Sequence, residues 1–256
     1  MIDSKAAIDL DAELAENVSV GPFSVIGKDV QIGANTVIGP HVVIRGPTTI
    51  GADNHIYQFA SIGEDPQDRK YANEVTRLEI GDRNKIREFT TMHRGTHQDK
   101  SVTKIGSDNL FMAYTHVAHD CIIGDHVIMA NGASLAGHVH LGSHAILGGF
   151  TLVHQFTQIG QFSFSAMGSA ITQDIPPFVM VGGRPTQPHG INSVGLEREG
   201  CLPEVIRQIR KAYKILYKSN MKLEDAIEEI EDLAGDHAEI SGMVSFLRNV
   251  TRGILR

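Results

Sequence analysis

The sequence is poor in several residues that ordinary globular cores and extracellular scaffolds use. It contains no tryptophan, and aromatic residues occupy 6% of its 256 positions. Its two cysteines, Cys121 and Cys201, are too few for a disulfide framework. No apolar run approaches the ~20 residues needed to span a bilayer, and the N-terminus has neither a basic start nor an apolar stretch. These absences favour a cytoplasmic protein without a transmembrane segment.

Charge is modest as well, whereas glycine and histidine are plentiful. The 23 Lys and Arg against 30 Asp and Glu give a net charge of −7, which provides no reason to expect nucleic acid as a partner. The chain has 26 glycines and 13 histidines. A glycine-rich composition without tryptophan is typical of a solenoid with many corners rather than of a single globular core.

The dominant pattern is an apolar residue that returns every six positions. It runs from Ile105 to Ile171 with one exception at Ser165, and an earlier series runs from Val20 to Ile62. Glycine or alanine often follows the apolar residue, which we expect to permit a tight corner. A period of six matches neither a helix nor an alternating strand, and three such units make one triangular coil of 18 residues. The pattern therefore predicts a mainly β fold, a parallel β-helix.

Two polar segments interrupt the repeat. Between Ile62 and Ile80 the interior positions would fall on Asp68 and Glu74, which an apolar column does not accept. We therefore expect residues 64–78 to leave the wall as a loop. Residues 94–104 form a second excursion, because Met92 and Ile105 are 13 positions apart instead of six. Long loops on a regular scaffold often carry function.

The repeat stops after Ile171, and the rest of the chain is expected to be helical. Residues 174–200 are rich in proline and glycine and are interpreted as an extended connector. Apolar residues at three- and four-residue intervals then predict helices over 203–218, 223–234 and 237–249. The expected organisation is a β-helix over residues 1–185, followed by a connector and small α-helical domain over 186–256.

Polar residues gather on one corner of the predicted triangle. Counting coils, with 94–104 treated as an excursion, places Met92, Val117, Leu135, Val153 and Ile171 at equivalent positions. Beside them lie His93, His116, His119, Asp120, Gly137, His138, His154 and Gln155. Because coils stack ~4.8 Å apart, His119, Gly137 and Gln155 should form one vertical file and Asp120 and His138 another. His126, His140 and His144 fall elsewhere and are expected to be surface residues.

A set of motifs then identifies a family. They are YQFASIGE, DRKY, IREFTTMHRGT, HVAHDCIIG, AGHVHLG and LVHQF, with KAYKILYKS and TRGILR near the C-terminus. With them the sequence resembles, nearly end to end, the UDP-N-acetylglucosamine 3-O-acyltransferases, hexapeptide-repeat enzymes that open lipid A synthesis. The resemblance implies left-handed coils and a cytoplasmic homotrimer with active sites between subunits. It also implies transfer of a 3-hydroxyacyl group from acyl carrier protein to the 3-hydroxyl of UDP-N-acetylglucosamine. No cofactor of its own is implied, because 4′-phosphopantetheine arrives on the carrier protein.

The resemblance also assigns the chemistry to particular residues. A sugar hydroxyl needs a general base with a pKa near neutrality, which favours histidine. By the motif HVAHDC this base is His119, with Asp120 as the orienting carboxylate. The backbone N–H of Gly137 is the expected donor to the oxyanion.

The remaining expected roles are in substrate binding. The resemblance implies that Gln67, Asp68 and Lys70 hold the sugar, that His93, His116, His138 and Gln155 contact the sugar or diphosphate, that His154 lines the acyl side, and that Asn192 and Arg198 reach the nucleotide. The sequence differs from the family pattern at Pro185, Val194 and Glu199, where His, Glu and Arg are common.

Met167 is expected to set the length of the acyl chain. Counted from Ser165, it occupies neither of the two interior positions of its hexad, so its side chain should point out of the coil. In the family, a bulky residue at the matching position shortens the acyl groove. A methionine fills the room of roughly three or four methylenes, which predicts a donor of about ten carbons rather than about fourteen.

Other functions remain as alternatives. The related N-acyltransferase of the same pathway carries an additional N-terminal domain, whereas here the repeat begins near the first residue. Carbonic anhydrases of the hexapeptide fold bind zinc between subunits, but these histidines climb one corner without a matching trio, so we expect no metal. A structural scaffold would not need the histidine file. Basic residues on the predicted 203–218 helix have two possible partners. One is an acidic carrier protein, and the other is the set of acidic residues on the next helix.

Overall fold

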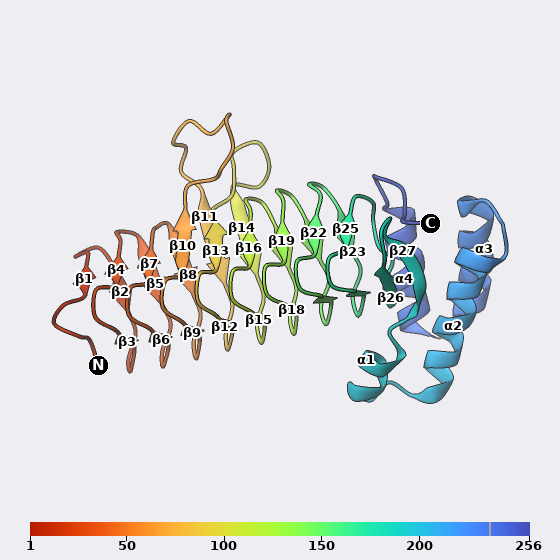
Figure 1. Cartoon of the computed structure of the whole chain (residues 1–256), viewed down its shortest axis with the longest axis horizontal. Helices are drawn as coiled ribbons and strands as arrows, with labels where there is room; N and C mark the ends of the chain where they lie inside the picture. Colours follow the sequence, from red (N-terminus) through yellow and green to blue (C-terminus); the bar gives the residue numbers. More distant parts are fainter. Residues whose placement is uncertain (236) are drawn as a thin grey trace.

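The computed structural model describes residues 1–235 and 237–256 and shows an elongated three-sided coil with helices at one end (Figure 1). Its described strands form three sheets that run the length of the coil. Sheet 1 contains β1 (Ala7–Ile8), β4 (Val25–Ile26), β7 (Val43–Ile44), β10 (Ser61–Glu64), β13 (Thr91–His93), β16 (His116–Val117), β19 (Ser134–Leu135), β22 (Leu152–Val153) and β25 (Ala170–Ile171). Sheet 2 contains β2 (Glu13–Leu14), β5 (Val30–Ile32), β8 (Thr48–Ile50), β11 (Arg77–Ile80), β14 (Val102–Ile105), β17 (Ile122–Ile123), β20 (His140–Leu141) and β23 (Gln158–Ile159). Sheet 3 contains β3 (Ser19–Val20), β6 (Val37–Ile38), β9 (His55–Ile56), β12 (Lys85–Ile86), β15 (Leu110–Phe111), β18 (Ile128–Met129), β21 (Ile146–Leu147), β24 (Phe164–Ser165), β26 (Val179–Gly182) and β27 (Gln187–Ile191).

The register of the coils follows the six-residue period. Val117 pairs in parallel with Leu135, 18 positions later, and Leu135 pairs with Val153. The apolar residue that ends each of these strands is buried inside the coil. Ser165, the exception in the repeat, is also interior, and its hydroxyl lies 2.9 Å from that of Thr151, which satisfies both groups. The predicted β-helix and its apolar column are confirmed.

The glycines that follow the apolar residues have a different role from the corner-forming role that the pattern suggested. The left-handed conformation at the corners is adopted by residues such as Asp29, Asp120 and His138, at φ between 56° and 61°. The glycine after the apolar residue is needed because coils stack closely: a Cβ on Gly33 would lie 2.5 Å from the carbonyl carbon of Gly51. The corner interpretation was therefore wrong, since these glycines permit stacking.

Both excursions are present and are shorter than expected. The first spans residues 65–76 between β10 and β11, and the second spans residues 94–101 between β13 and β14. Leu78 and Thr103 return to the wall as fully buried residues, so the strands resume earlier. Because both loops connect sheet 1 to sheet 2, they leave from the same edge of the coil, where Figure 1 shows them projecting.

The C-terminal part caps the coil. The expected connector is only partly irregular, because β26 and β27 form an antiparallel hairpin on sheet 3, followed by α1 (Ser193–Arg198). The helices α2 (Pro203–Lys218), α3 (Leu223–Ala234) and α4 (Ala238–Arg248) pack together, and α2 contacts β27. The tail returns to the coil through the buried Asp174, which pairs with Ile254. Among the described residues, no helix has the length and apolarity to cross a membrane.

Candidate active site

The predicted polar corner exists as a stack of three turns between sheet 1 and sheet 2. We call residues 118–121, 136–139 and 154–157 the site corner; they link β16 to β17, β19 to β20 and β22 to β23. The strands before them pair in register, so equivalent turn residues lie one above another. Both excursions leave from the same corner one or two coils below. The sequence-based stacking of this region is confirmed.

His119 and Asp120 form a hydrogen-bonded pair at the base of this stack. His119 Nδ1 lies 2.8 Å from Asp120 Oδ2, and the Asp120 carboxylate is almost completely buried. Burial alone would raise the pKa of Asp120, but hydrogen bonds from His119 and Thr96 hold that pKa below its ordinary value. A charged acceptor at Nδ1 fixes the proton there and leaves Nε2 as the basic nitrogen.

Gly137 lies directly against the His119 ring. A Cβ built on Gly137 would lie 2.5 Å from His119 Cε1 and 2.7 Å from Nε2, so any larger residue here would displace the imidazole. Within the described part of the chain, the Gly137 N–H donates no hydrogen bond. A basic nitrogen and a free backbone donor therefore lie together, as a reaction that passes through an oxyanion requires.

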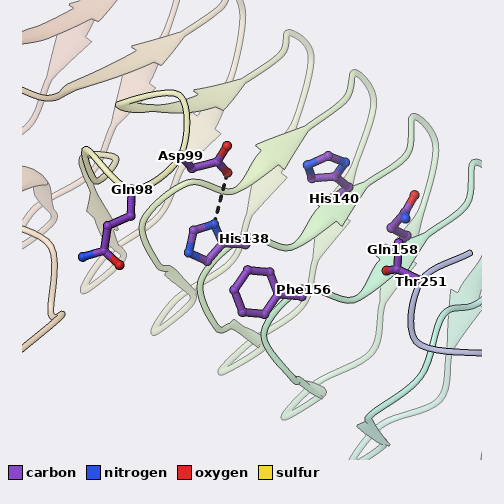
Figure 2. Close-up of a pocket in the computed structure, with 7 residues that line it drawn as sticks. All are labelled: Gln98, Asp99, His138, His140, Phe156, Gln158 and Thr251. Atoms are coloured by element: carbon purple, nitrogen blue, oxygen red, sulfur yellow. Dashed lines mark hydrogen bonds and ion pairs between the residues drawn. The ribbon is translucent and has the colours of Figure 1, made fainter. Parts of the chain in front are cut away.

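His138 connects the pair to a neighbouring cavity. Its Nδ1 lies 3.1 Å from Asp99 Oδ2 in the second excursion, and its Nε2 lies 3.8 Å from Asp120 Oδ2. Its ring stacks on Phe156 with centroids 4.3 Å apart. The cavity has a volume of about 450 Å³ and is lined by Gln98, Asp99, His138, His140, Phe156, Gln158 and Thr251 (Figure 2). The second excursion therefore forms one wall of a pocket at the site corner.

His140 was expected to be a surface residue away from the polar corner; its exposure is confirmed, but the expected distance from the corner was wrong. It lines this cavity, because β20 begins directly after the turn that contains His138. Partial burial, together with the nearby Lys100, lowers its pKa. His126 and His144 lie on another corner, where their rings stack with centroids 4.7 Å apart. Glu199, one of the positions that differ from the family pattern, lies 3.7 Å from His144.

Two further histidines lie one coil apart on sheet 1. The His93 and His116 rings meet edge to face with centroids 5.1 Å apart, and His116 Nδ1 lies 2.7 Å from Thr91 Oγ1. Burial, reinforced by neighbouring histidines, lowers the pKa of His93 to about 4 and also lowers that of His116. Both rings are therefore neutral near pH 7, and the buried Nδ1 of His93 has no hydrogen-bond partner among the described residues.

The first excursion carries the residues expected to hold a sugar. Gln67 and Lys70 are exposed, while Asp68 is half-buried and accepts a hydrogen bond from the Lys70 backbone N–H at 3.0 Å. The loop is fastened to the second excursion by Arg94, which donates to Asp65 and Tyr71. Polar groups of the loop are thus presented on the side of the coil that carries the histidines.

Several predicted residues lie apart from His119 in this chain. His154 and Gln155 are exposed at the top of the site corner. Asn192 instead caps α1, accepting from Gly195 N and donating to Phe162 O, and Arg198 ends the same helix. Met167 is 78% exposed in the turn between β24 and β25, on the opposite edge of sheet 1. Its predicted outward direction is confirmed.

The cluster of His119, Asp120 and His138 is also the one to consider for a metal ion. Their nearest ligand atoms lie within 4.8 Å of one another. However, both Asp120 oxygens already accept hydrogen bonds from Thr96, and Oδ2 also accepts from His119. A carboxylate that holds the second nitrogen of a histidine is an orienting partner rather than a ligand of the same ion. This donor set does not fit a closed zinc site.

Sequence reasoning missed the residues that support the pair. Thr96 and Thr103 contact Asp120 from the two ends of the second excursion, Asp99 contacts His138, and Arg94 joins the two loops. Their only signal in the sequence was their position inside or next to an excursion that leaves from the histidine corner. Contacts made by an irregular loop have no period from which they could be predicted.

Comparison with known proteins gives consistent matches over the whole chain. The family described as "Udp N-acetylglucosamine O-acyltransferase; Domain 2" matches residues 174–255, and bacterial transferase hexapeptide repeats match 11–46, 29–64 and 103–137. The acyl-[acyl-carrier-protein]–UDP-N-acetylglucosamine O-acyltransferase of Halorhodospira halophila is 54% identical, covering 100% of this chain and 99% of its own. The protein of the same name from Pseudomonas putida is 52% identical with the same coverage.

Solved structures agree with these sequence matches. The UDP-N-acetylglucosamine acyltransferase of Francisella novicida is 40% identical with a TM-score of 0.98, covering 100% of this chain and 94% of its own. The UDP-N-acetylglucosamine O-acyltransferase of Moraxella catarrhalis is 44% identical with a TM-score of 0.98, covering 100% and 99%. The fold is the expected left-handed parallel β-helix with C-terminal helices.

Proposed function

The chain belongs to the UDP-N-acetylglucosamine O-acyltransferase family, and from this premise we propose its substrates and the roles of its residues. It is an acyltransferase of lipid A synthesis. It transfers a 3-hydroxyacyl group from acyl carrier protein to the 3-hydroxyl of UDP-N-acetylglucosamine, in the cytoplasm. The observation that carries this proposal is the His119–Asp120 pair with Gly137 packed against the His119 ring, its N–H without an acceptor among the described residues.

The proposed reaction uses that geometry. His119 Nε2 removes the proton of the sugar 3-hydroxyl as its oxygen attacks the thioester carbonyl. The Gly137 N–H donates to the oxyanion of the tetrahedral intermediate, and the Asp120 carboxylate stabilises the imidazolium. Collapse of the intermediate forms the sugar ester and breaks the carbon–sulfur bond. The departing phosphopantetheine thiolate then takes the proton from His119, which restores the neutral base.

The substrates extend along the corner on both sides of His119. The first excursion binds the sugar through Gln67, Asp68 and Lys70. The neutral rings of His93 and His116, together with His138 and Gln155, contact the sugar and diphosphate. His154 lines the acyl side, and Asn192 and Arg198 reach the nucleotide. The latter two residues lie away from His119 in one chain, so they would act in the site of a neighbouring subunit.

A homotrimer explains an exposed aromatic row on the opposite edge of sheet 1. The rings of Phe23, His41, Phe59, Phe89 and Tyr114 stack at centroid distances between 4.8 and 5.3 Å. We call this row the aromatic corner; its phenylalanines and tyrosine are 41–63% exposed. Exposed apolar patches mark interaction surfaces. Packing the aromatic corner of one subunit on the site corner of the next is a head-to-tail contact, which can close a ring.

This arrangement also gives Met167 its role. Met167 lies on the same edge of sheet 1 as the aromatic corner, between β24 and β25. In a ring it would face the site corner of the adjacent subunit and end its acyl groove. The enzyme therefore prefers a donor of about ten carbons to one of about fourteen.

The test is incubation of the purified protein with UDP-N-acetylglucosamine and 3-hydroxyacyl carrier proteins of graded length. The expected product is an ester at the 3-position, which mild alkali cleaves. A parallel reaction uses a UDP-3-O-acyl sugar with a free 2-amine, the type of substrate the related N-acyltransferase requires. An alkali-stable amide from that reaction, without ester formation in the first, would contradict the proposal.

A further inference from the structure

We propose that the start of the second excursion, residues 94–96, is a brace that positions both halves of the site. Thr96 holds the Asp120 carboxylate that orients His119, and Arg94 holds the loop that carries the sugar-binding residues. This inference rests on the proposed roles of His119 and of the first excursion. It adds two positioning residues, neither of which touches the reacting atoms.

The first arm of the brace is Thr96. It is 1% exposed, its backbone N–H donates to Asp120 Oδ1 at 2.8 Å, and its hydroxyl donates to Oδ2 at 2.6 Å. Oδ2 is the same oxygen that faces His119 Nδ1. The threonine therefore fixes the plane of the carboxylate and shares the charge that stabilises the His119 imidazolium. Without the hydroxyl, one backbone contact remains and the carboxylate can rotate.

The second arm is Arg94. Its guanidinium is nearly buried and donates to the Gly63 carbonyl, to the Asp65 carboxylate and to the Tyr71 hydroxyl. A buried cation requires such partners, because burying it unpaired is costly. These three partners lie before and after the segment that contains Gln67, Asp68 and Lys70. Arg94 therefore closes the base of the sugar loop.

The two arms are joined rigidly through Gly95. A Cβ at Gly95 would lie 2.2 Å from Val102 N, so this glycine lets the brace pack against the start of β14. The Arg94 N–H donates to Glu64 O and the Gly95 N–H to Arg77 O, which ties the segment to both ends of the first excursion. Thr96 thus acts on the Asp120 carboxylate and Arg94 on the sugar loop, although the two residues are only two positions apart in the sequence.

This division predicts different kinetic effects for the two arms. Thr96→Val should lower kcat by about 10- to 100-fold with little change in KM for UDP-N-acetylglucosamine, because only the base is misplaced. On the acidic side of its rate–pH profile, the fall in turnover should begin at a higher pH. The reason is that the charge on Asp120 Oδ2 is no longer shared with the threonine hydroxyl. Thr96→Ser should recover most of the turnover. Arg94→Gln should instead raise KM for the sugar nucleotide by about tenfold and affect kcat less.

Thr36→Val is the matched control, because Thr36 is a buried threonine whose hydroxyl also makes two hydrogen bonds, but it lies in the turn between β5 and β6, away from the site corner. If Thr96→Val does not fold, Thr96→Ala removes the same hydroxyl with less bulk; for Arg94, Arg94→Lys is the second variant. The proposed brace would be contradicted by a threonine variant with wild-type kcat and an unshifted acidic side of the rate–pH profile. An arginine variant with an unchanged KM for UDP-N-acetylglucosamine would also contradict it. A fall in kcat that disappears once the rate is divided by the folded fraction would also overturn it. A His119→Ala enzyme with full turnover would instead refute the proposed function.

Discussion

His119 is the residue whose removal should cost most. We predict that His119→Ala folds normally and loses about 10²–10⁴-fold in turnover, because a positioned general base typically contributes that much. Asp120→Ala should lose less, since the imidazole remains but is less well oriented. The measurement is kcat with saturating substrates, alongside a circular dichroism check of folding.

His126→Ala provides the control for that experiment. It is an exposed histidine on a different corner and contacts His144 rather than the pair. Its turnover should stay within about twofold of the wild type, as expected of a surface substitution. Comparable losses in His119→Ala and His126→Ala would remove His119 from the role of base.

His93 should make the protein sensitive to acid. Its pKa is lowered to about 4 in the folded state by burial, while the unfolded chain titrates near the ordinary 6.5. The unfolded state therefore binds the proton first, so the free energy of unfolding falls as pH drops from about 6.5 to about 4 and is unaffected by this group above that window. The shift corresponds to about 3 kcal/mol at most. His93→Gln should flatten the decline in melting temperature between pH 7 and 4.5.

The exposed His97 gives the comparison for this pH effect. His97→Gln removes a histidine from the surface of the second excursion and should leave the acid dependence unchanged. A melting profile of His93→Gln that parallels the wild type would show that the ring titrates normally when folded.

At the scale of single residues, the sequence predicted the site residues that occupy repeated positions of the coil and missed those that lie in the excursions. Equivalent positions 18 apart placed Gly137 beside His119 without a structure. Thr96 reaches Asp120 only because an eight-residue loop folds back on its corner, and loop conformation leaves no periodic signal. His140 is exposed as expected, but it begins the strand that follows the site corner and therefore lines the cavity beside His138.

Among the elements, the helices were predicted more closely than the connector before them. Pro203 at the start of α2 and Gly235 after α3 marked the ends that the structure shows. The hairpin of β26 and β27 was missed, because the glycines and prolines in and around its turn suggest a linker. Its buried Val179 and Val181 complete the sheet instead.

The α2 helix carries an exposed basic stripe that should receive the acyl carrier protein. Its five bases are Arg207, Arg210, Lys211, Lys214 and Lys218, all exposed. Within residues 1–235 and 237–256, none of them forms an ion pair, although α2 packs against the acidic α3. Carrier proteins are strongly acidic, so free bases favour electrostatic steering. We predict that Arg210→Glu/Lys214→Glu raises KM for acyl carrier protein by about tenfold at low salt, and less as ionic strength rises.

The matched variant is Lys28→Glu/Lys85→Glu, which makes the same charge change on exposed lysines of the β-helix instead of on α2. It should leave that KM nearly unchanged. Equal increases in both variants would indicate an effect of net charge alone, and no increase at low salt would indicate that α2 serves only the packing of the helices.

On the scale of the whole molecule, a single chain holds only part of the proposed site. The period of six predicted the coil because each hexad solves the same packing problem, but no residue pattern encoded its hand. The chain also separates two of its proposed functional residues, since His119 and Met167 lie on opposite edges of sheet 1. They can serve one reaction only if adjacent subunits bring the two edges together.

Met167→Gly should therefore lengthen the preferred donor. Removing the side chain frees the room of roughly three or four methylenes, each worth ~0.8 kcal/mol when buried. We predict that the optimum moves from about ten carbons towards about fourteen, with folding unaffected because Met167 is 78% exposed. The measurement is kcat/KM for a series of 3-hydroxyacyl carrier proteins. A wild-type preference for the longest donor, or an unchanged optimum in the variant, would reduce Met167 to a surface residue.

Mixed trimers show whether the base and the length limit come from different subunits. One chain carries His119→Ala with native Met167, and the other carries native His119 with Met167→Gly. The first chain is co-expressed in large excess, so each functional His119 has first-type neighbours. If the site is shared, the functional base faces a neighbour's methionine and the mixture prefers the short donor. If base and limit belong to one chain, every active site contains glycine at position 167 and the mixture prefers the long donor.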